Sequence, residues 1–337
     1  MRHRRLFFST LLAMAWSILP LKSAFADDLN ETIVVTIEND IFTGSDNNYT
    51  NGFAATWTSD ALSEYEKGSL PKRIANGLDF MPGFDGDQDY LTFSLVHQIN
   101  TPSDITIANP PLNDQPYSGV LLFGTGLFSD RPNGSQLWTL RIGAIGPVTQ
   151  ADHIQIEFHD WIGADEPLGW ETQLPNEALF NIGYLRTGTV AEAGPSSRFD
   201  WRFNAIGSFE IGNYATAAAA GGIFEFGGRR NDTRTTVSIE NGIGIVPEPG
   251  AARSEGLDVS AYIGAGTFAV AHFAPLDGTT FRSSRSVDYS PLIGFTSVGL
   301  TARYGRLLTS FSLNKGVTFS NTDAEVDYGA ISIGWTY

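Results

Sequence analysis

Large apolar residues alternate with small or polar ones along most of the chain, at a period of two. In the last segment Ile331, Ile333 and Trp335 take one set of alternate positions, while Ser332 and Gly334 fall between them. This alternation is typical of β-strands with one apolar and one polar face. Twelve runs show it, at 31–38, 50–59, 89–100, 117–128, 135–146, 177–190, 198–211, 214–227, 256–273, 287–301, 303–315 and 328–337. The sequence therefore predicts an all-β protein with an even number of strands.

Two architectures fit such strands, and the chain favours one of them. A soluble β-sandwich also has many short strands and Gly-rich turns. A membrane barrel puts apolar side chains in lipid and polar ones in a wet lumen, and it closes because lipid cannot hydrogen-bond an open edge. The last strand ends in an aromatic residue, Tyr337, as in strands that the barrel-assembly machinery recognises during insertion. We predict a transmembrane antiparallel β-barrel of about twelve strands.

The first 26 residues have the three parts of a secretory signal peptide. Arg2, Arg4 and Arg5 precede an apolar run at 6–21, and small residues stand at positions 24 and 26. No later apolar run reaches the roughly 18 residues that a membrane-spanning helix needs. We predict a signal peptide at 1–26 and one barrel domain at 27–337, in the outer membrane of a Gram-negative bacterium.

Composition narrows the chemistry. The chain has no cysteine, which excludes disulfides, thiolate nucleophiles and Cys-bound metals. It has 21 basic and 37 acidic residues, and four of the basic ones fall in the signal peptide, so the remainder carries 17 minus 37, or −20. This charge argues against nucleic acid as a partner. It favours cation sites built from oxygen ligands, or simply solubility.

Three long connections separate the predicted strands, at 60–88, 100–115 and 147–176, and we expect all three on the extracellular side. The third contains a predicted helix that Thr149 would cap and Gly163 would end. Gln155 and His159, four residues apart, would share one face of this helix. A separate apolar stripe of the helix would pack against the barrel or lie in lipid. It consists of Ile154, Phe158, Trp161 and Ile162. An isolated histidine such as His159 is more often structural than catalytic.

A second unusual segment, 39–52, follows the first predicted strand and is rich in side-chain oxygens. Hard cations such as Ca²⁺ take six to eight oxygen ligands, so Asp40 with Asn39, Asp46 or nearby carbonyls would begin such a site. The spacing does not fit an EF-hand. Tight turns use the same residue types, which is the structural alternative.

Several motifs in order resemble the LpxR family of outer-membrane lipid A deacylases. The resemblance covers essentially the whole chain after the signal peptide, and its specific residues lie between 38 and 177. They are Asn39-Asp40, Tyr49-Thr50-x-Gly52, Asp114-x-Pro116-Tyr117-Ser118-Gly119, Gln155-x-x-x-His159, Gly163-Ala164-Asp165 and Gly169-Trp170-x-x-Gln173-Leu174-x-Asn176-Glu177.

The resemblance implies a twelve-stranded barrel that removes the 3′-acyloxyacyl chain from lipid A by Ca²⁺-dependent ester hydrolysis. It also implies roles for individual residues: His159 as the catalytic histidine, Gln155 as its neighbour on the loop helix, Asn39 and Asp40 as the pair at the calcium site, Thr50 as a functional threonine and Asp165 as a functional acid.

These residue types suit ester hydrolysis. An imidazole that is neutral at physiological pH can take a proton from water, and a bound Ca²⁺ can stabilise the negative charge that forms on the attacked carbonyl. The chain has no G-x-S-x-G motif, which agrees with a water nucleophile and weakens a serine-esterase interpretation. Oxygen ligands suit Ca²⁺ better than a soft metal, with Mg²⁺ as the alternative.

One departure from the family concerns the phosphates of lipid A. The loop at 101–115 has no Lys or Arg, where the family places basic residues, and phosphates are normally bound by Arg, Lys or a cation. Lys72, Arg73 and Arg186 are the candidate substitutes. Two other functions remain open from the sequence: a non-catalytic pore or structural barrel, and a barrel phospholipase.

Overall fold

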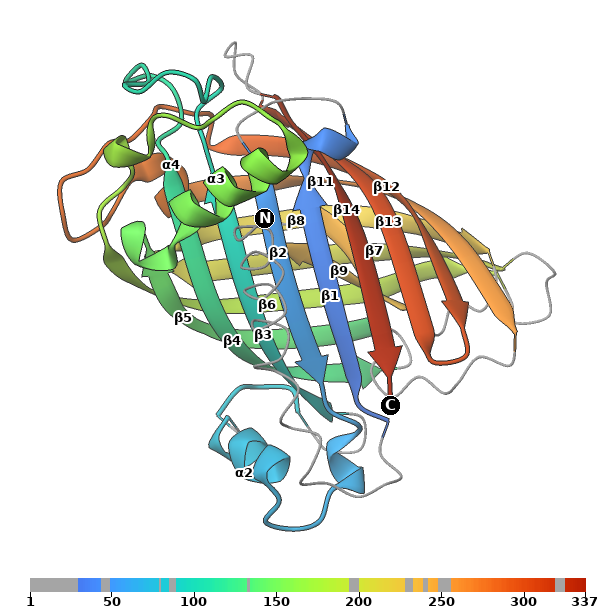
Figure 1. Ribbon diagram of the computed structural model, residues 1–337. Helices are drawn as coiled ribbons and strands as arrows, with labels where there is room; N and C mark the ends of the chain where they lie inside the picture. Colours follow the sequence, from blue (N-terminus) through green and yellow to red (C-terminus); the bar gives the residue numbers. More distant parts are fainter. Residues whose placement is uncertain are drawn as a thin grey trace.

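The computed structural model describes residues 30–43, 49–78, 80–84, 89–131, 134–193, 200–227, 233–238, 242–247, 256–318 and 325–337. The predicted signal peptide, 1–26, lies outside these residues. Twelve antiparallel strands close into a barrel in the order β1-β14-β13-β12-β11-β8-β7-β6-β5-β4-β3-β2 (Figure 1). The predicted twelve-stranded barrel is confirmed. No helix in the described part of the chain is long and apolar enough to cross a membrane.

Each predicted run corresponds to one barrel strand. The strands are β1 Thr32–Asn39, β2 Tyr49–Thr58, β3 Asp89–Asn100, β4 Ser118–Arg131, β5 Gly134–Ile145, β6 Glu177–Glu192, β7 Asp200–Gly212, β8 Ala215–Gly227, β11 Leu257–Phe273, β12 Leu292–Tyr304, β13 Leu307–Thr318 and β14 Glu325–Thr336. A separate two-stranded ribbon, β9 Thr233–Ser238 with β10 Gly242–Pro247, was not predicted.

The boundary between β12 and β13 was predicted too early. The sequence placed it near residue 302, whereas the turn lies at Gly305-Arg306, where Gly305 adopts a φ of +58°. Glycine adopts this left-handed conformation without the steric cost that other residues have there. Alternating residues continue on both sides of the turn, so alternation alone does not show where the chain reverses.

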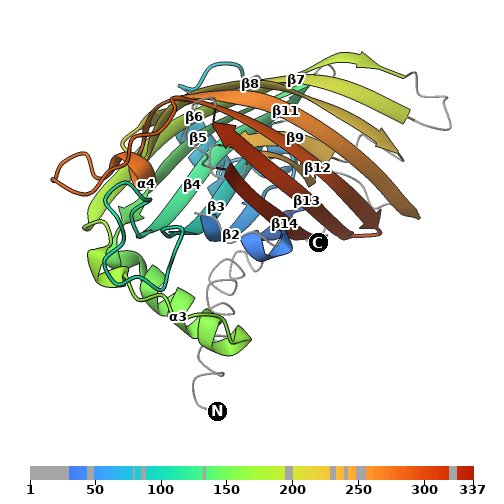
Figure 2. The ribbon, with the colours of Figure 1, turned by 90° about the horizontal axis from the view of Figure 1, so that it is seen from above.

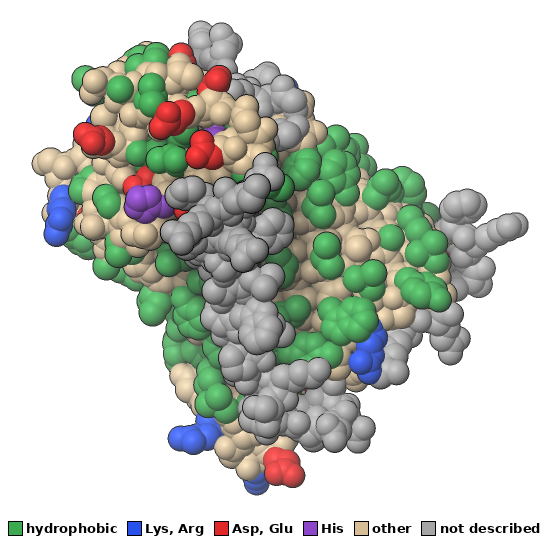
Figure 3. All heavy atoms as spheres, in the orientation of Figure 1, with side chains coloured by type: hydrophobic (Ala, Val, Ile, Leu, Met, Phe, Trp, Pro, Cys, Tyr) green, Lys and Arg blue, Asp and Glu red, His purple; other side chains and the backbone are tan. Residues whose placement is uncertain are grey.

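The two faces of each strand have opposite environments. On β7 the side chains of Trp201 and Phe203 are exposed, while Arg202 and Asn204 are buried. The buried set faces the lumen, where Arg202 pairs with Glu225 of β8 at 2.7 Å. Apolar side chains cover the outer wall (Figure 3). This is the arrangement that lipid outside and polar groups inside require.

The connections between strands lie at two ends of the barrel, which we call the terminal end and the α3 end (Figure 1). The terminal end holds Tyr337 and the connection at 59–88, with η3 Leu62–Glu64 and α2 Leu70–Gly77. The α3 end holds η2 Asp40–Phe42, η4 Pro147–Thr149, α3 Ala151–Ile162, η5 Trp170–Thr172 and α4 Ala274–Asp277.

One of the three long connections is therefore not where we expected it. The loops at 101–117 and 146–176 share the α3 end, but the connection at 59–88 lies at the terminal end. In an antiparallel barrel successive connections alternate between the ends, and this alternation decides the side independently of loop length.

A hydrogen-bonded cluster joins the first and last strands at the terminal end. The Nε1 of Trp57 donates to Glu31 Oε2 at 3.3 Å and to the hydroxyl of Tyr337 at 3.1 Å, and the hydroxyl of Tyr65 donates to Glu31 Oε1 at 2.8 Å. The amide of Tyr337 also donates to the Glu31 carbonyl at 3.0 Å. These bonds fix the last residue beside the start of β1.

Candidate active site

The site is built around helix α3, which lies outside the barrel wall at the α3 end (Figure 2). The helix ends as predicted, because Gly163 adopts the left-handed conformation that closes a helix (φ 76°). Its start differs from the prediction. Gln150, with a φ of 60°, is the N-cap residue, and Thr149 instead belongs to η4, where its hydroxyl donates to the Gly146 carbonyl at 2.8 Å.

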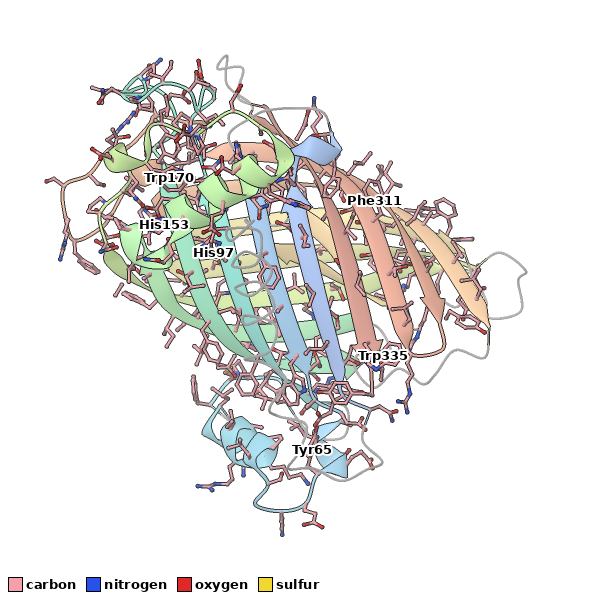
Figure 4. All side chains as sticks on the ribbon, in the orientation of Figure 1. Tyr65, His97, His153, Trp170, Phe311 and Trp335 are labelled. Carbon is pink, nitrogen blue, oxygen red and sulfur yellow. The ribbon has the colours of Figure 1, made fainter. Side chains whose placement is uncertain are left out.

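A glycine on β4 lets this segment dock on the wall. A Cβ on Gly119 would overlap Thr149 Oγ1 and the Cβ of Ala151. Beneath the same segment, Nε2 of His97 on β3 lies 3.1 Å from the Thr149 carbonyl (Figure 4). A carbonyl can only accept, so His97 donates this bond. The start of α3 is thus fixed to the outer face of β3 and β4.

Helix α3 has its polar face buried and part of its apolar face exposed. Ala151, Gln155 and His159 are its buried residues, whereas Trp161 is 47% and Ile162 42% exposed. An ordinary surface helix buries its apolar face. The reversed arrangement fits a helix whose outer face meets an apolar phase and whose inner face encloses polar groups against the wall.

His159 has a defined hydrogen bond. Its Nδ1 lies 2.6 Å from the backbone carbonyl of Asp165. The carbonyl has no proton to give, so Nδ1 carries the proton and the neutral ring keeps Nε2 free to accept one. The amide of Ala164 returns a bond to the His159 carbonyl at 3.0 Å. The turn after α3 therefore sets the tautomer of the histidine.

Gln155 is oriented by Trp170 of η5. The Trp170 Nε1 donates to Gln155 Oε1 at 2.8 Å. Because an indole nitrogen is only a donor, the bond shows which end of the amide is oxygen. Gln155 is 2% exposed, and within the described residues its Nε2 is buried without a partner. A buried, unpaired amide donor is costly to leave unsatisfied, which marks it as a group available to a ligand.

The loop at 101–117 supports Trp170 from behind. The rings of Tyr117 and Trp170 have centroids 4.8 Å apart, and a Cβ on Gly169 would overlap the Tyr117 ring. The Tyr117 hydroxyl donates to the Ile105 carbonyl at 3.1 Å, and the Leu168 amide donates to the same carbonyl at 2.8 Å. Burial raises the pKa of Tyr117 to about 12, so this hydroxyl stays a donor at physiological pH.

The other predicted site residues lie at neighbouring strand ends of the same rim. Asn39 ends β1 and Asp40 begins η2, and both are buried, at 5% and 3% exposure. Thr50 falls at a bulge in the pairing of β2 with β3, between the paired residues Tyr49 and Asn51. Bulges re-aim side chains and are frequent beside active sites. The side chain of Thr50 lies outside the described part of the structure.

The oxygen groups of Asn39 and Asp40 fit a hard cation in kind but not in number. Their two side chains offer oxygen ligands at a buried position, whereas Ca²⁺ takes six to eight. No group of three or more His, Asp or Glu side chains suited to a metal occurs among the described residues. Asp46, the other carboxylate that we predicted here, lies outside them.

The structure brings Gln155, His159 and the turn at Asp165 into one cluster, in which the backbone of Asp165 makes the contact. Its backbone carbonyl contacts the histidine, and its side chain is exposed. The sequence did not reveal Trp170 as the residue that orients Gln155. The only signal was the spacing of Gly169-Trp170 within the family motif.

Two of the candidate phosphate-binding residues are far from this cluster. Lys72 and Arg73 belong to α2, at the terminal end of the barrel. They cannot contact a ligand at α3, so that expectation is wrong. Arg186 lies within β6 with its side chain exposed, opposite Gln136 of β5 and Gly207 of β7.

A twelve-stranded barrel with a histidine and an amide enclosed between its wall and a loop helix defines the class: a membrane β-barrel with an enzyme-like site at one rim. The model of the family described as "Outer membrane protein LpxR" matches residues 6–337. The chain belongs to this family, which confirms the predicted family and the outer-membrane location. Membership implies a lipid A deacylase, an ester hydrolase.

Two solved structures are similar to this chain, and the first has the same fold. LpxR from Salmonella typhimurium is similar with a TM-score of 0.69 and 20% sequence identity, over 91% of this chain and 100% of that one. The β-domain of the Bordetella autotransporter BrkA has a TM-score of 0.44 and 9% identity, over 92% and 100%. No curated protein matches the sequence.

Proposed function

We propose that the protein removes the 3′-acyloxyacyl chain of lipid A by ester hydrolysis, at the site between α3 and the barrel wall. The observation that carries the proposal is the reversed helix: Gln155 and His159 are enclosed against the wall while Trp161 and Ile162 face outward. An ester embedded in a membrane surface needs such a site, polar within and open to lipid. The α3 end would accordingly face the outer leaflet.

His159 and Gln155 have different roles in the proposed reaction. Nε2 of His159 takes a proton from water, and the water oxygen attacks the ester carbonyl. The free Nε2–H of Gln155 donates to the carbonyl oxygen as it becomes negative. The bond between the acyl carbon and the sugar oxygen then breaks, and His159 returns its proton to that oxygen. The products are an acyloxyacyl fatty acid, with its secondary chain still attached, and a sugar hydroxyl.

Asp165 and Trp170 position these two groups. The Asp165 carbonyl holds the proton of His159 on Nδ1, and Trp170 keeps the nitrogen of Gln155 free. Positioning matters because a loss of about 1 Å in the placement of reacting groups can lower the rate by about a hundredfold.

Asn39 and Asp40, with Thr50 beside them, would hold the calcium ion. When bound, Ca²⁺ would stabilise negative charge on the substrate oxygens as a Lewis acid. Ion binding has a test independent of catalysis: terbium luminescence should report a site that Ca²⁺ displaces, and Asp40→Asn should weaken it. Equal terbium binding by wild type and Asp40→Asn would remove Asp40 from the site.

Mass spectrometry of lipid A tests the proposal directly. Cells would express the wild type, His159→Ala or His153→Ala, each checked for heat-modifiable migration of the folded barrel and assayed with and without Ca²⁺. His153 is the matched control, because it lies on the same helix with its side chain exposed (Figure 4). We expect a Ca²⁺-dependent loss of one acyloxyacyl unit with the wild type and His153→Ala, and none with His159→Ala.

Other outcomes separate the alternative functions. Unchanged lipid A with free fatty acid released from phospholipids would identify a phospholipase. No change in either lipid class, with a folded barrel, would favour a pore or structural barrel. Equal deacylation by His159→Ala and the wild type would remove the histidine from the mechanism.

A further inference from the structure

Among the described connections at the α3 end, one contains basic residues. The described residues of the connections at this end are 40–43, 101–117, 146–176, 213–214 and 274–291. Of these five ranges only 274–291 contains Lys or Arg, namely Arg282 and Arg285, together with Asp277 and Asp288, while the other four contain nine Asp and Glu residues. Figure 3 shows acidic side chains across the loops of this end. Within these described connections, the two arginines are therefore the Lys or Arg groups that an anionic ligand could meet.

Arg285 is held in place without a counter-ion. Its Nη2 donates to the carbonyls of Pro111 at 2.6 Å and Pro110 at 3.3 Å, across to the loop at 101–117. Its Nε is buried and unpartnered within the described residues. Among those residues, no carboxylate forms an ion pair with Arg282 or Arg285. A fixed guanidinium bound only to neutral oxygens retains its full charge for an anion.

Arg282 is exposed on a turn that its own backbone stabilises. The Thr279 hydroxyl donates to the Arg282 carbonyl at 3.0 Å, and the Thr279 amide donates to the Ser284 hydroxyl at 2.8 Å. The base of the turn is tied to Glu177 on β6, whose carboxylate accepts from the amides of Thr280 and Phe281 at 2.8 and 2.7 Å. The two arginines therefore stand on an ordered segment.

An open hollow of about 530 Å³ adjoins this turn, lined by Thr279, Thr280 and Phe281 together with Phe180 and Ile211 of the wall. Phe180 and Ile211 are 53% and 60% exposed on the lipid-facing side. Asp277 and His272 also line the hollow, with 3.6 Å between Asp277 Oδ2 and His272 Nδ1, and the Asp277 carboxylate accepts from the Phe273 amide at 2.6 Å and the Tyr289 hydroxyl at 2.7 Å. The hollow thus has an apolar wall toward the membrane, and the turn that carries Arg282 forms its rim directly after Phe281.

We infer that this rim is a binding site for a phosphorylated membrane lipid. The phosphate would be bound by the exposed guanidinium of Arg282, which can match phosphate oxygens with two parallel donors, and the fixed charge of Arg285 would attract it. The acyl chain would lie over Phe180 and Ile211. Arg285 contacts one part of the loop at 101–117 and Leu168 contacts another, so the lipid site and the His159 cluster are separate places on one rim.

Native mass spectrometry of the full barrel, released from detergent, would count bound lipids. The probes are lipid A with both phosphates, the same lipid without phosphates, and inorganic phosphate. All variants carry His159→Ala, so that no ester is cleaved during the measurement. Arg73→Ala at the terminal end is the matched control for loss of one positive charge.

We expect Arg282→Ala to weaken binding of the phosphorylated lipid about tenfold, the loss of roughly one charge-assisted contact. Arg282→Lys should weaken this binding less than Arg282→Ala does. Arg73→Ala should bind the phosphorylated lipid as tightly as the parent, which is the protein with His159→Ala alone. Phe281→Ala should weaken binding of both lipids alike. Because the readout is binding, it does not depend on whether the protein hydrolyses lipid A.

Three results would overturn the inference. One is equal binding of the phosphorylated lipid by Arg282→Ala and the parent. The second is equal affinity of the parent for the two lipids. The third is displacement of the phosphorylated lipid by millimolar inorganic phosphate, which would assign the arginines to a free anion.

Discussion

Trp170 and Gln155 form the contact that determines the polarity of the candidate active site. The indole Nε1 donates to the amide oxygen at 2.8 Å, and this leaves the amide nitrogen of Gln155 buried and unpartnered in the described structure. Without that bond the amide could rotate and present its oxygen instead. An oxygen at this place would repel a carbonyl oxygen that is becoming negative.

Trp170→Phe is therefore expected to lower kcat about tenfold or more, with a smaller change in KM. The phenyl ring keeps the packing on Tyr117 but removes the donor, and a buried acceptor left unsatisfied costs about 1–3 kcal/mol. Deacylation of lipid A in detergent micelles measures both constants. Trp161→Phe is the matched control, because Trp161 is 47% exposed on the outer face of the same helix. Similar kinetics for the two variants would contradict the role given to Trp170.

Asp165 gives a second prediction, because the structure uses its carbonyl rather than its carboxylate. Asp165→Ala keeps the backbone carbonyl that accepts from His159 Nδ1 at 2.6 Å, so we expect kcat within about threefold of the wild type. His159→Ala removes the general base, and losses of about 10²–10⁴-fold are typical of that change. The same micelle assay compares them. If Asp165→Ala falls as far as His159→Ala, the carboxylate acts directly.

Gly119 gives a third prediction, which concerns docking of the helix. A Cβ at this position would overlap Thr149 and Ala151, and such overpacking typically costs about 1–3 kcal/mol. We expect Gly119→Ala to keep the heat-modifiable barrel, lose most deacylation and make the loop at 146–176 more sensitive to protease. Gly207→Ala is the control, because a Cβ on Gly207 meets nothing within 4 Å. Full activity in Gly119→Ala would show that α3 does not need this close contact.

The sequence was sufficient to predict the barrel, because alternation acts locally in each strand. The buried Arg202 and Asn204 and the exposed Trp201 and Phe203 appear directly in the order of residues. The ribbon β9–β10 was missed because each of its strands has only six residues, and the turn at Gly305 was missed because the alternation continues through it. Placement of the connection at 59–88 required the topology of the closed barrel.

The site could be predicted only as a set of residue types. The spacing of Gln155 and His159 correctly put them on one buried face of α3. Thr149 has the side chain of a helix cap, but its hydroxyl bonds to Gly146 in the preceding turn. Contacts such as Trp170 with Gln155 depend on how the loop folds back after the helix, and no local pattern encodes that path.

The cluster at the terminal end gives the last prediction, a pH dependence of stability. Burial, and then the negative charge of Glu31, raise the pKa of Tyr337 to about 12, above the value of about 10 for an unfolded tyrosine. The folded barrel thus favours the neutral phenol, so the contribution of Tyr337 is complete below about pH 10 and is lost as the pH rises through about 12. Burial and the bond to Glu31 also raise the pKa of Tyr65.

We expect the melting temperature of the barrel in detergent to fall as the pH rises from about 10 to about 12. It should fall less steeply in Tyr337→Phe, because phenylalanine has no proton to lose. Tyr304→Phe, at a position 68% exposed, is the control and should follow the wild type. The same alkaline slope in wild type and Tyr337→Phe would mean that other groups cause the loss.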